Sequence, residues 1–294
     1  MTSGGLLELD AIGTRWQIET ARPLSPAPRA RIQDVIEDYD RTWSRFRPDS
    51  LVTEIAAAPA GGRFELPRHA VALLDLYDRL HELTDGALDP LVGRDLELLG
   101  YDATYSLRAA PLPDRVRAHE RRARWPDVRR RGRTITTDRP VLIDVGAAGK
   151  GQLVDLVAQV LEDEGVEAFV VDAGGDLRQR GDAPIRVGLE HPLDALRVVG
   201  TVDLHDRALC ASAANRRAWG PGLHHVLDAR TGTCVDRVLA TWVIAETAML
   251  ADGLATALFL TEPDRLQPAF GFSFVRMRPD GLETSDGFEG ETFA

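Results

Sequence analysis

Lysine is almost absent from this sequence. Of the 35 lysine and arginine residues, Lys150 alone is lysine. A GC-rich genome is the simplest source of such a bias. Against that background the one lysine marks a position that arginine cannot serve, because an ammonium group is compact and a guanidinium group is a planar fork. The alternative is that this lysine is there by chance.

The sequence also lacks an excess of positive charge and any long apolar run. A net charge of −11 argues against nucleic-acid binding as the main function. No apolar run approaches the roughly 20 residues that a membrane-spanning helix needs. The first ten residues show neither the basic region nor the apolar core of a signal peptide. We therefore expect a cytoplasmic protein with no membrane span.

Cysteine is scarce, since the chain has only two such residues, Cys210 and Cys234. Their spacing does not form a pair of metal ligands. A disulfide between them is not required by the sequence, although it is not excluded either. A cytosolic setting would keep both thiols reduced.

The fold class follows from the order of the predicted elements. Hydrophobic residues make up 44% of the chain and charged residues 28%, as in a globular protein with ample core. Strands are predicted at 6–20 with a break at Gly13, 141–145, 168–172, 185–189, 197–204, 240–245 and 272–277. Helices are predicted at 28–43, 67–83, 152–164 and 248–260. Strands and helices without strict alternation indicate an α+β fold.

Residues 105–140 differ from the rest in composition. Four prolines lie in this stretch, and nine arginines lie in its central part, from Arg115 to Arg133. One interpretation is a patch for an anionic ligand or a nucleic acid. The favoured interpretation is a helix and a hairpin that face water, because the chain as a whole is acidic.

A glycine-rich turn surrounds the lone lysine, at Gly146–Gly151 between a predicted strand and a predicted helix. Such a turn presents backbone N–H groups to an anion, and the helix dipole favours negative charge there. The spacing fits neither a Walker A loop nor a Gly-x-Gly-x-x-Gly motif. Asp144, at the end of the strand, either bonds amides of the turn or contacts a ligand. The turn itself is a phosphate site or a tight packing turn.

A carboxylate and a hydroxyl share one face of the helix predicted at 248–260. Asp252 and Thr256 are four residues apart, so both point to one side of that helix. Oxygen ligands in apolar surroundings suit a hard cation such as Mg²⁺. The alternative is a threonine bonded back to its own helix and an aspartate at the rim.

Two adjacent histidines, His224 and His225, precede the turn at 228–232. No cysteine pair and no His-x-Glu lies beside them, which disfavours zinc. Contact of one histidine with a ligand is the preferred interpretation. A structural histidine with satisfied hydrogen bonds is the alternative.

Together these motifs resemble the ApbE family of flavin transferases. The stretches that carry the resemblance are Asp144-Val-Gly-Ala-Ala-Gly-Lys150-Gly with Asp155, Asp172-Ala-Gly-Gly-Asp176, His224-His225-Val-Leu-Asp228-Ala-Arg-Thr-Gly232 and Ala251-Asp252-Gly-Leu-Ala-Thr256-Ala. Weaker similarities are Ile12-Gly-Thr14, Ser44-Arg-Phe46 with Ser50, and Gly86-Ala-Leu-Asp89. The resemblance covers about residues 10–275.

The resemblance implies a fold and an activity. The implied fold is α+β, with duplicated lobes related to T-folds, in a single domain over residues 1–294. The implied activity is a Mg²⁺-dependent transfer, in which the FAD pyrophosphate is cleaved, FMN is attached to a Thr or Ser of an acceptor protein, and AMP is released. Some members instead hydrolyse FAD to FMN and AMP.

The resemblance also implies roles for individual residues. Lys150 and Asp252 would be catalytic. Mg²⁺ would be held by the carbonyl of Ala147 together with Asp252 and Thr256. The residues implied to contact FAD are Ile12, Ala87, Leu88, Asp89, Asp144, Lys150 and His225.

Three positions depart from the family pattern. Ile12 replaces a methionine, Leu88 replaces a phenylalanine, and Ala56 stands where members often have asparagine or tyrosine. The asparagine form accompanies FAD hydrolysis, so Ala56 disfavours a hydrolase. The departures also raise a third hypothesis, a flavin-binding protein without catalysis.

Overall fold

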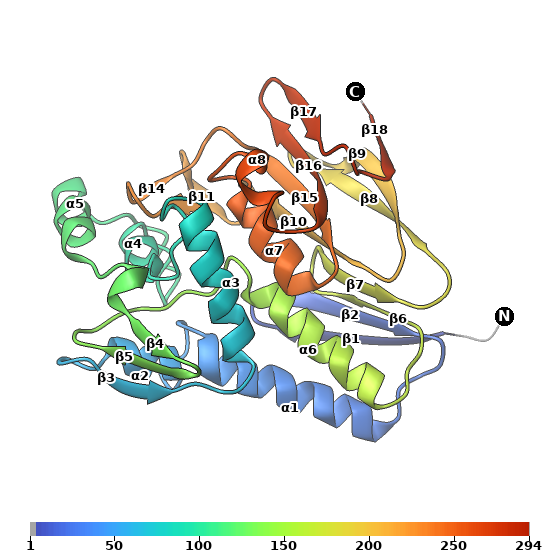
Figure 1. Ribbon diagram of the computed structural model, residues 1–294, viewed down its shortest axis with the longest axis horizontal. Helices are drawn as coiled ribbons and strands as arrows, with labels where there is room; N and C mark the ends of the chain where they lie inside the picture. The colour runs from blue at the N-terminus through green and yellow to red at the C-terminus, as the bar shows by residue number, and fades with distance from the viewer. Residues whose placement is uncertain (1–3, 294) are drawn as a thin grey trace. The chain divides into compact units, whose positions relative to one another are not determined.

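The computed structural model describes residues 4–293, which divide into two compact units (Figure 1). Unit 1 comprises residues 4–37, 148–216 and 237–293, and unit 2 comprises residues 38–147 and 217–236. The chain thus passes between the units four times. One passage falls inside helix α1 (Pro26–Trp43) and another inside the glycine-rich turn, after Ala147. The single domain expected from the sequence stays a prediction.

Unit 1 is built on an antiparallel sheet of eight strands in the order β1-β2-β6-β7-β10-β15-β16-β17. The strands are β1 (Gly5–Ala11), β2 (Thr14–Thr20), β6 (Phe169–Asp172), β7 (Asp176–Arg180), β10 (Ala208–Ala213), β15 (Ala240–Ala245), β16 (Phe272–Arg278) and β17 (Gly281–Thr284). A second sheet has the order β18-β9-β8, from β8 (Ile185–His191), β9 (Asp194–Leu204) and β18 (Gly290–Thr292). The helices α6 (Gly149–Asp163), α7 (Ala248–Ala257) and α8 (Pro263–Leu266) complete the unit.

The two faces of the large sheet in unit 1 are covered by different elements. Because side chains alternate along a strand, Trp242 and Val243 of β15 point to opposite sides. Trp242 packs with Leu189, Val202 and Leu204 of the small sheet. On the other face, Thr241 donates to the carbonyl of Ala255 in α7. The small sheet therefore covers one face, and α6 and α7 cover the other.

Unit 2 has more residues in helices than in strands. Its elements are α2 (Leu51–Ala56), β3 (Gly62–Glu65), α3 (Ala70–Leu83), α4 (Gly93–Leu98), α5 (Leu112–Arg121), a 3₁₀ turn (Trp125–Asp127), β4 (Arg129–Arg131) and β5 (Thr134–Thr137), with β11 (Ala218–Gly220), β12 (Leu223–His224), β13 (Leu227–Asp228) and β14 (Thr233–Cys234). A small sheet has the order β3-β5-β4. One core cluster joins Leu96, Leu99, Tyr101 and Leu227.

The α+β prediction is confirmed, and one predicted strand is wrong. Residues 141–145 form no strand. In this segment Asp144 N donates to the carbonyl of Pro90, which belongs to no strand. Val141, Ile143 and Val145 are buried, as the alternation indicates, but no neighbouring strand completes a ladder. No helix within residues 4–293 is long and apolar enough to cross a bilayer.

The turn of the first hairpin carries backbone strain. Pairing of Ala11 with Thr14 leaves Ile12 and Gly13 as a two-residue loop. Their φ angles are 45° and 76°, and a turn with two positive φ angles favours Asn-Gly. A β-branched residue is a conformational outlier in this region, at a cost of about 1–3 kcal/mol. Ile12 is therefore held in a strained conformation.

We expect Ile12→Asn to raise the free energy of unfolding by about 1 kcal/mol, because asparagine tolerates a positive φ. Urea denaturation of both proteins measures the change. Leu6→Asn, on an exposed position of the same hairpin, is the control and should alter stability little. A lower stability of Ile12→Asn would show that contacts of the isoleucine outweigh its strain.

Candidate functional site

The lone lysine belongs to a buried ion pair in unit 1. Lys150 lies in the first turn of α6, and its Nζ lies 2.6 Å from Asp176 Oδ2. The same Nζ donates to the carbonyl of Ala173 at 3.1 Å. Asp176 is the first residue of β7 and is fully buried. Its Oδ1 accepts no hydrogen bond from any described residue, so the lysine is its main source of compensation.

Helices α6 and α7 approach each other closely beside this pair. A Cβ atom at Gly151 would lie 2.1 Å from the carbonyl oxygen of Ala248 and 2.7 Å from Asp252 Cβ, so only glycine fits. The contact lets Gly151 N donate to Asp252 Oδ2 at 2.9 Å. The carboxylate of Asp252 therefore lies at the N-terminal turn of α6, where the helix dipole favours an anion.

The set of charges around Lys150 favours a further cation. Asp176 and Asp252 carry two negative charges against one ammonium. Asp252 is 4% exposed, and Thr256 follows it one turn later on α7. Within residues 4–293 no three His, Cys, Asp or Glu side chains are grouped as metal ligands. A cation here would thus rely on one carboxylate, a hydroxyl and backbone oxygen, which is a donor set that fits Mg²⁺.

The protonation states in this cluster follow from burial and charge. Burial by itself lowers the pKa of Lys150, but the carboxylates of Asp176 and Asp252 outweigh it and raise the pKa above its usual value. Lys150 is therefore an ammonium at neutral pH. Burial, with the same two carboxylates, raises the pKa of Cys210 well above its usual value, so this residue is a neutral thiol.

Asp155 holds the start of α7. Its two carboxylate oxygens accept bonds from Ala248 N at 2.9 Å and Met249 N at 2.8 Å. Burial raises the pKa of Asp155 to about 6, although these two amide bonds lower it in part. The residue stands in the motif around Lys150, although no role was predicted for it.

In unit 2, Asp144 bonds the glycine-rich turn. Its Oδ1 accepts from Gly146 N at 2.7 Å, and its Oδ2 accepts from Arg45 Nε at 2.6 Å. The structural alternative for Asp144 is therefore realised. Contact of Asp144 with FAD stays a prediction, as does metal ligation by Ala147, the last residue of this segment of unit 2.

The two histidines have different surroundings. His224 Nε2 bonds the carbonyl of Val235 at 2.7 Å and His224 Nδ1 accepts from Val226 N, so it is a structural histidine. His225 Nδ1 is buried without a hydrogen-bond partner among the described residues. Burial, followed by the charge of Arg217, lowers the pKa of His225 to about 3. His225 is thus a neutral imidazole with a nitrogen that a ligand can use.

The predicted flavin-contacting segment 87–89 is buried in unit 2. Ala87 accepts from Ala229 N through its carbonyl at 2.9 Å. Asp89 accepts from Leu91 N at 2.8 Å and from Trp125 N at 3.1 Å through its carboxylate. Both carboxylate oxygens of Asp89 therefore already accept hydrogen bonds within unit 2.

The arginine-rich stretch is only partly a solvated surface. Helix α5 has no buried residue, as expected. Arg122, just after it, is 4% exposed at its side chain and lies 2.9 Å from Asp95 Oδ2 and 3.7 Å from Asp89 Oδ2. Arg122 and Arg124 both donate to the carbonyl of Ala229. The expectation that these arginines face water is thus wrong for Arg122, because two buried carboxylates need a cation.

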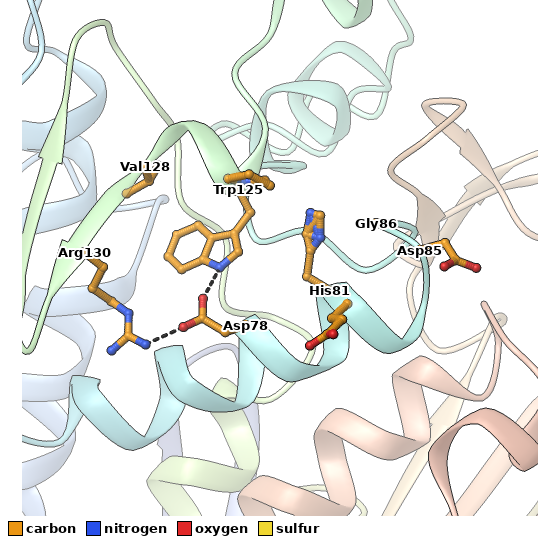
Figure 2. Close-up of a pocket in the computed structure, with 9 residues that line it drawn as sticks. Asp78, His81, Asp85, Gly86, Trp125, Val128 and Arg130 are labelled. Carbon is orange, nitrogen blue, oxygen red and sulfur yellow. Dashed lines mark hydrogen bonds and ion pairs between the residues drawn. The ribbon is translucent and has the colours of Figure 1, made fainter. Parts of the chain in front are cut away.

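A hollow of about 440 Å³ also lies in unit 2, beside α3 (Figure 2). Trp125 donates its indole N–H to Asp78 there at 2.6 Å, and Arg130 forms an ion pair with the same carboxylate. His81, whose Nε2 has no hydrogen-bond partner among the described residues, lies near Trp125. None of the residues predicted to form the site lines this hollow.

Comparison with known proteins identifies the family. The ApbE family model matches residues 12–274. The chain belongs to the ApbE family. The FAD:protein FMN transferase of Vibrio cholerae is 28% identical over 247 residues, which are 81% of this chain and 74% of that protein. The FAD:protein FMN transferase of Klebsiella pneumoniae is 27% identical over 279 residues, which are 89% of this chain and 80% of that protein.

Solved structures of ApbE proteins share the fold. The ApbE protein of Thermotoga maritima superposes with a TM-score of 0.85 at 27% identity, over 98% of this chain and all of that one. The flavin transferase ApbE of Vibrio cholerae gives a TM-score of 0.82 at 25% identity, over 96% of each chain. The resemblance drawn from the ApbE motifs is therefore confirmed.

Three residues of the site had no role in the sequence analysis. Asp176 is the partner of Lys150, Asp155 caps α7, and Arg45 bonds Asp144. Each one stands inside a stretch that resembles the ApbE family, and that position is the signal that could have identified it. Their partners lie 26, 93 and 99 residues away in the chain.

The raised pKa of Asp155 predicts a pH dependence of stability. A folded pKa near 6, above the usual 3.8, means that the folded chain binds more protons between these values. The free energy of unfolding should therefore fall as pH rises from about 4 to 6, by about 1–3 kcal/mol. In urea denaturation, the free energy of unfolding of Asp155→Asn should not show this fall between pH 4 and 6.

The control is Asp163→Asn, on an exposed position at the end of the same helix. It should keep the wild-type profile between pH 4 and 6. Identical profiles for wild type and Asp155→Asn would contradict the raised pKa.

Proposed function

We propose that this chain is a Mg²⁺-dependent FAD:protein FMN transferase. Its relatives from Vibrio cholerae and Klebsiella pneumoniae are FAD:protein FMN transferases, and that name states the reaction. The observation that carries the proposal is the buried cluster of Lys150, Asp176 and Asp252, which places a fixed ammonium beside two buried carboxylates. Such a cluster suits a metal ion and a pyrophosphate, because each supplies the charge that the other lacks.

In this proposal the cation is held by Asp252, Thr256 and the carbonyl of Ala147. Bound Mg²⁺ supplies several kcal/mol of charge stabilisation to a phosphoryl group. Gly151 N holds the carboxylate of Asp252 at one oxygen, and Asp155 fixes the start of the helix that carries Asp252 and Thr256. The ligands on α7 are thus held in place before a cation binds.

Lys150 is proposed to offset the negative charge that grows on the leaving phosphate. The acceptor hydroxyl oxygen bonds to the phosphorus of the FMN half of FAD, the P–O–P bridge breaks, and AMP leaves with the bridging oxygen. The hydroxyl proton is released in the same exchange. Because the carboxylates of Asp176 and Asp252 outweigh the effect of burial and keep Lys150 charged, it needs no protonation change during the reaction.

The flavin nucleotide is proposed to contact Ile12, Ala87, Leu88, Asp89, Asp144, Lys150 and His225. His225 supports this assignment, because its buried Nδ1 is without a partner among the described residues and its low pKa keeps the ring neutral. The strained Ile12 supports it as well, since strain is often stored at ligand sites.

The acceptor is proposed to be a protein that presents a Thr or Ser hydroxyl. We propose the cytoplasm as the location. Both Cys210 and Cys234 are free thiols, and a reducing compartment keeps them so.

One mass spectrum tests the activity. The chain is incubated with FAD, Mg²⁺ and a candidate acceptor protein. We expect AMP and an acceptor whose mass has increased by one FMN unit. Free FMN and AMP without acceptor would instead indicate a FAD diphosphatase, and intact FAD would indicate a non-catalytic flavin-binding protein.

Asp252→Ala tests the site within the same assay. It should lower AMP release at least about 100-fold, because it removes a metal ligand. Asp264→Ala, on an exposed turn of α8, is the matched control and should keep wild-type activity. Removal of Mg²⁺ by EDTA should have the effect of Asp252→Ala. Undiminished AMP release from Asp252→Ala would contradict the assignment.

A further inference from the structure

We propose that Arg45 is a positioning residue, which fixes Asp144 and through it the first half of the glycine-rich turn. The inference rests on the proposed function, since Asp144 and Ala147 are the groups that it would place. Arg45 lies inside the stretch Ser44-Arg-Phe46, far from the turn in sequence.

Arg45 is buried to a degree that is rare for arginine. Its side chain is 2% exposed, and its Nε donates to Asp144 Oδ2 at 2.6 Å. Its Nη1 donates to the carbonyl of Tyr101 at 2.7 Å. A buried guanidinium is costly unless it is paired, and Asp144 is the carboxylate that the structure gives it. The geometry of Asp144 is thus set by a group that cannot leave for solvent.

Two aromatic rings pack against the guanidinium group of Arg45 and restrict its orientation. Its central carbon lies 4.3 Å from the ring centre of Phe46 and 4.9 Å from that of Tyr101. Trp219 stacks on Tyr101, with ring centres 5.3 Å apart. Such contacts attract a cation to the ring face and restrict its rotation. Only an arginine can bond two acceptors and stack in this way.

The second oxygen of Asp144 transmits this placement to the turn. Oδ1 accepts from Gly146 N at 2.7 Å, two residues further along the chain. A Cβ atom at Gly146 would lie 2.8 Å from the same oxygen, so the turn fits closely around the carboxylate. The next residue is Ala147, whose carbonyl is a proposed metal ligand. Arg45, Asp144 and Gly146 therefore form one chain of bonds that ends at the proposed site.

Arg45→Met tests the inference, because methionine keeps an unbranched stem and removes the guanidinium. Arg47→Met is the matched control, since Arg47 lies two residues away and its half-buried side chain pairs with Asp40 and Asp49 rather than with Asp144. Arg45→Lys restores the charge without the fork. Thermal unfolding of each variant shows which ones are folded. If Arg45→Met does not fold, Arg45→Lys is used in its place.

Hydrogen exchange of the Gly146 amide is the first readout, and it needs neither FAD nor metal. We expect exchange to be faster by about 10- to 100-fold in Arg45→Met, intermediate in Arg45→Lys and unchanged in Arg47→Met, because the acceptor of that amide loses its anchor. Unchanged exchange in a folded Arg45→Met protein overturns the inference.

A double-mutant cycle with Asp144→Asn is the second readout. If Arg45 acts through Asp144, AMP release falls by about 10- to 100-fold in Arg45→Met, and little further when Asp144→Asn is already present. Losses that multiply overturn the inference. A wild-type chain that releases no AMP refutes the proposed function instead, and hydrogen exchange still decides whether Arg45 positions the turn.

Discussion

The ion pair between Lys150 and Asp176 is the interaction on which the rest of the candidate site in unit 1 depends. Asp176 is fully buried at the start of β7, and an isolated carboxylate there would be unstable. Lys150 neutralises it while remaining an ammonium, and Asp252 lies close enough to raise the pKa of that lysine further. The ion pair therefore fixes an ammonium beside two buried carboxylates, those of Asp176 and Asp252. A divalent cation and an anionic substrate would add charges of both signs to this cluster.

Backbone packing places these charges more firmly than the side chains alone could. Gly151 lets α6 touch α7, and its amide then holds Asp252. Asp155, one turn further along α6, holds the first amides of α7. Two contacts between the same helices thus fix the helix that carries Asp252 and Thr256. In unit 2, Asp144 performs a similar task for the glycine-rich turn. Preorganisation of this kind lets electrostatic stabilisation act without rearrangement.

The sequence revealed the groups of the site better than it revealed their partners. Lys150, Asp252 and Thr256 stood out because their local pattern was unusual, and the helix that carries Asp252 and Thr256 was predicted from period 3.6 alone. Lys150 was predicted in the turn before a helix at 152–164, whereas α6 already begins at Gly149. The strand predicted at 141–145 failed because alternation reports burial and not a ladder partner. Asp176 and Arg45 were missed since their bonds join residues distant in the chain. Arg122 was assigned to the surface because net charge averages over a segment and says nothing of single side chains.

The charge at position 150 must be an ammonium if this account is right, and the other basic residues of the chain are all arginine. The most direct measurement is therefore the rate of AMP release from FAD by Lys150→Arg, with thermal unfolding to show that the variant is folded. Arginine keeps the charge, but its planar fork cannot occupy the place of a compact ammonium between Asp176 and the carbonyl of Ala173. We predict the loss of most activity in a folded protein. Release of AMP at the wild-type rate would contradict the account.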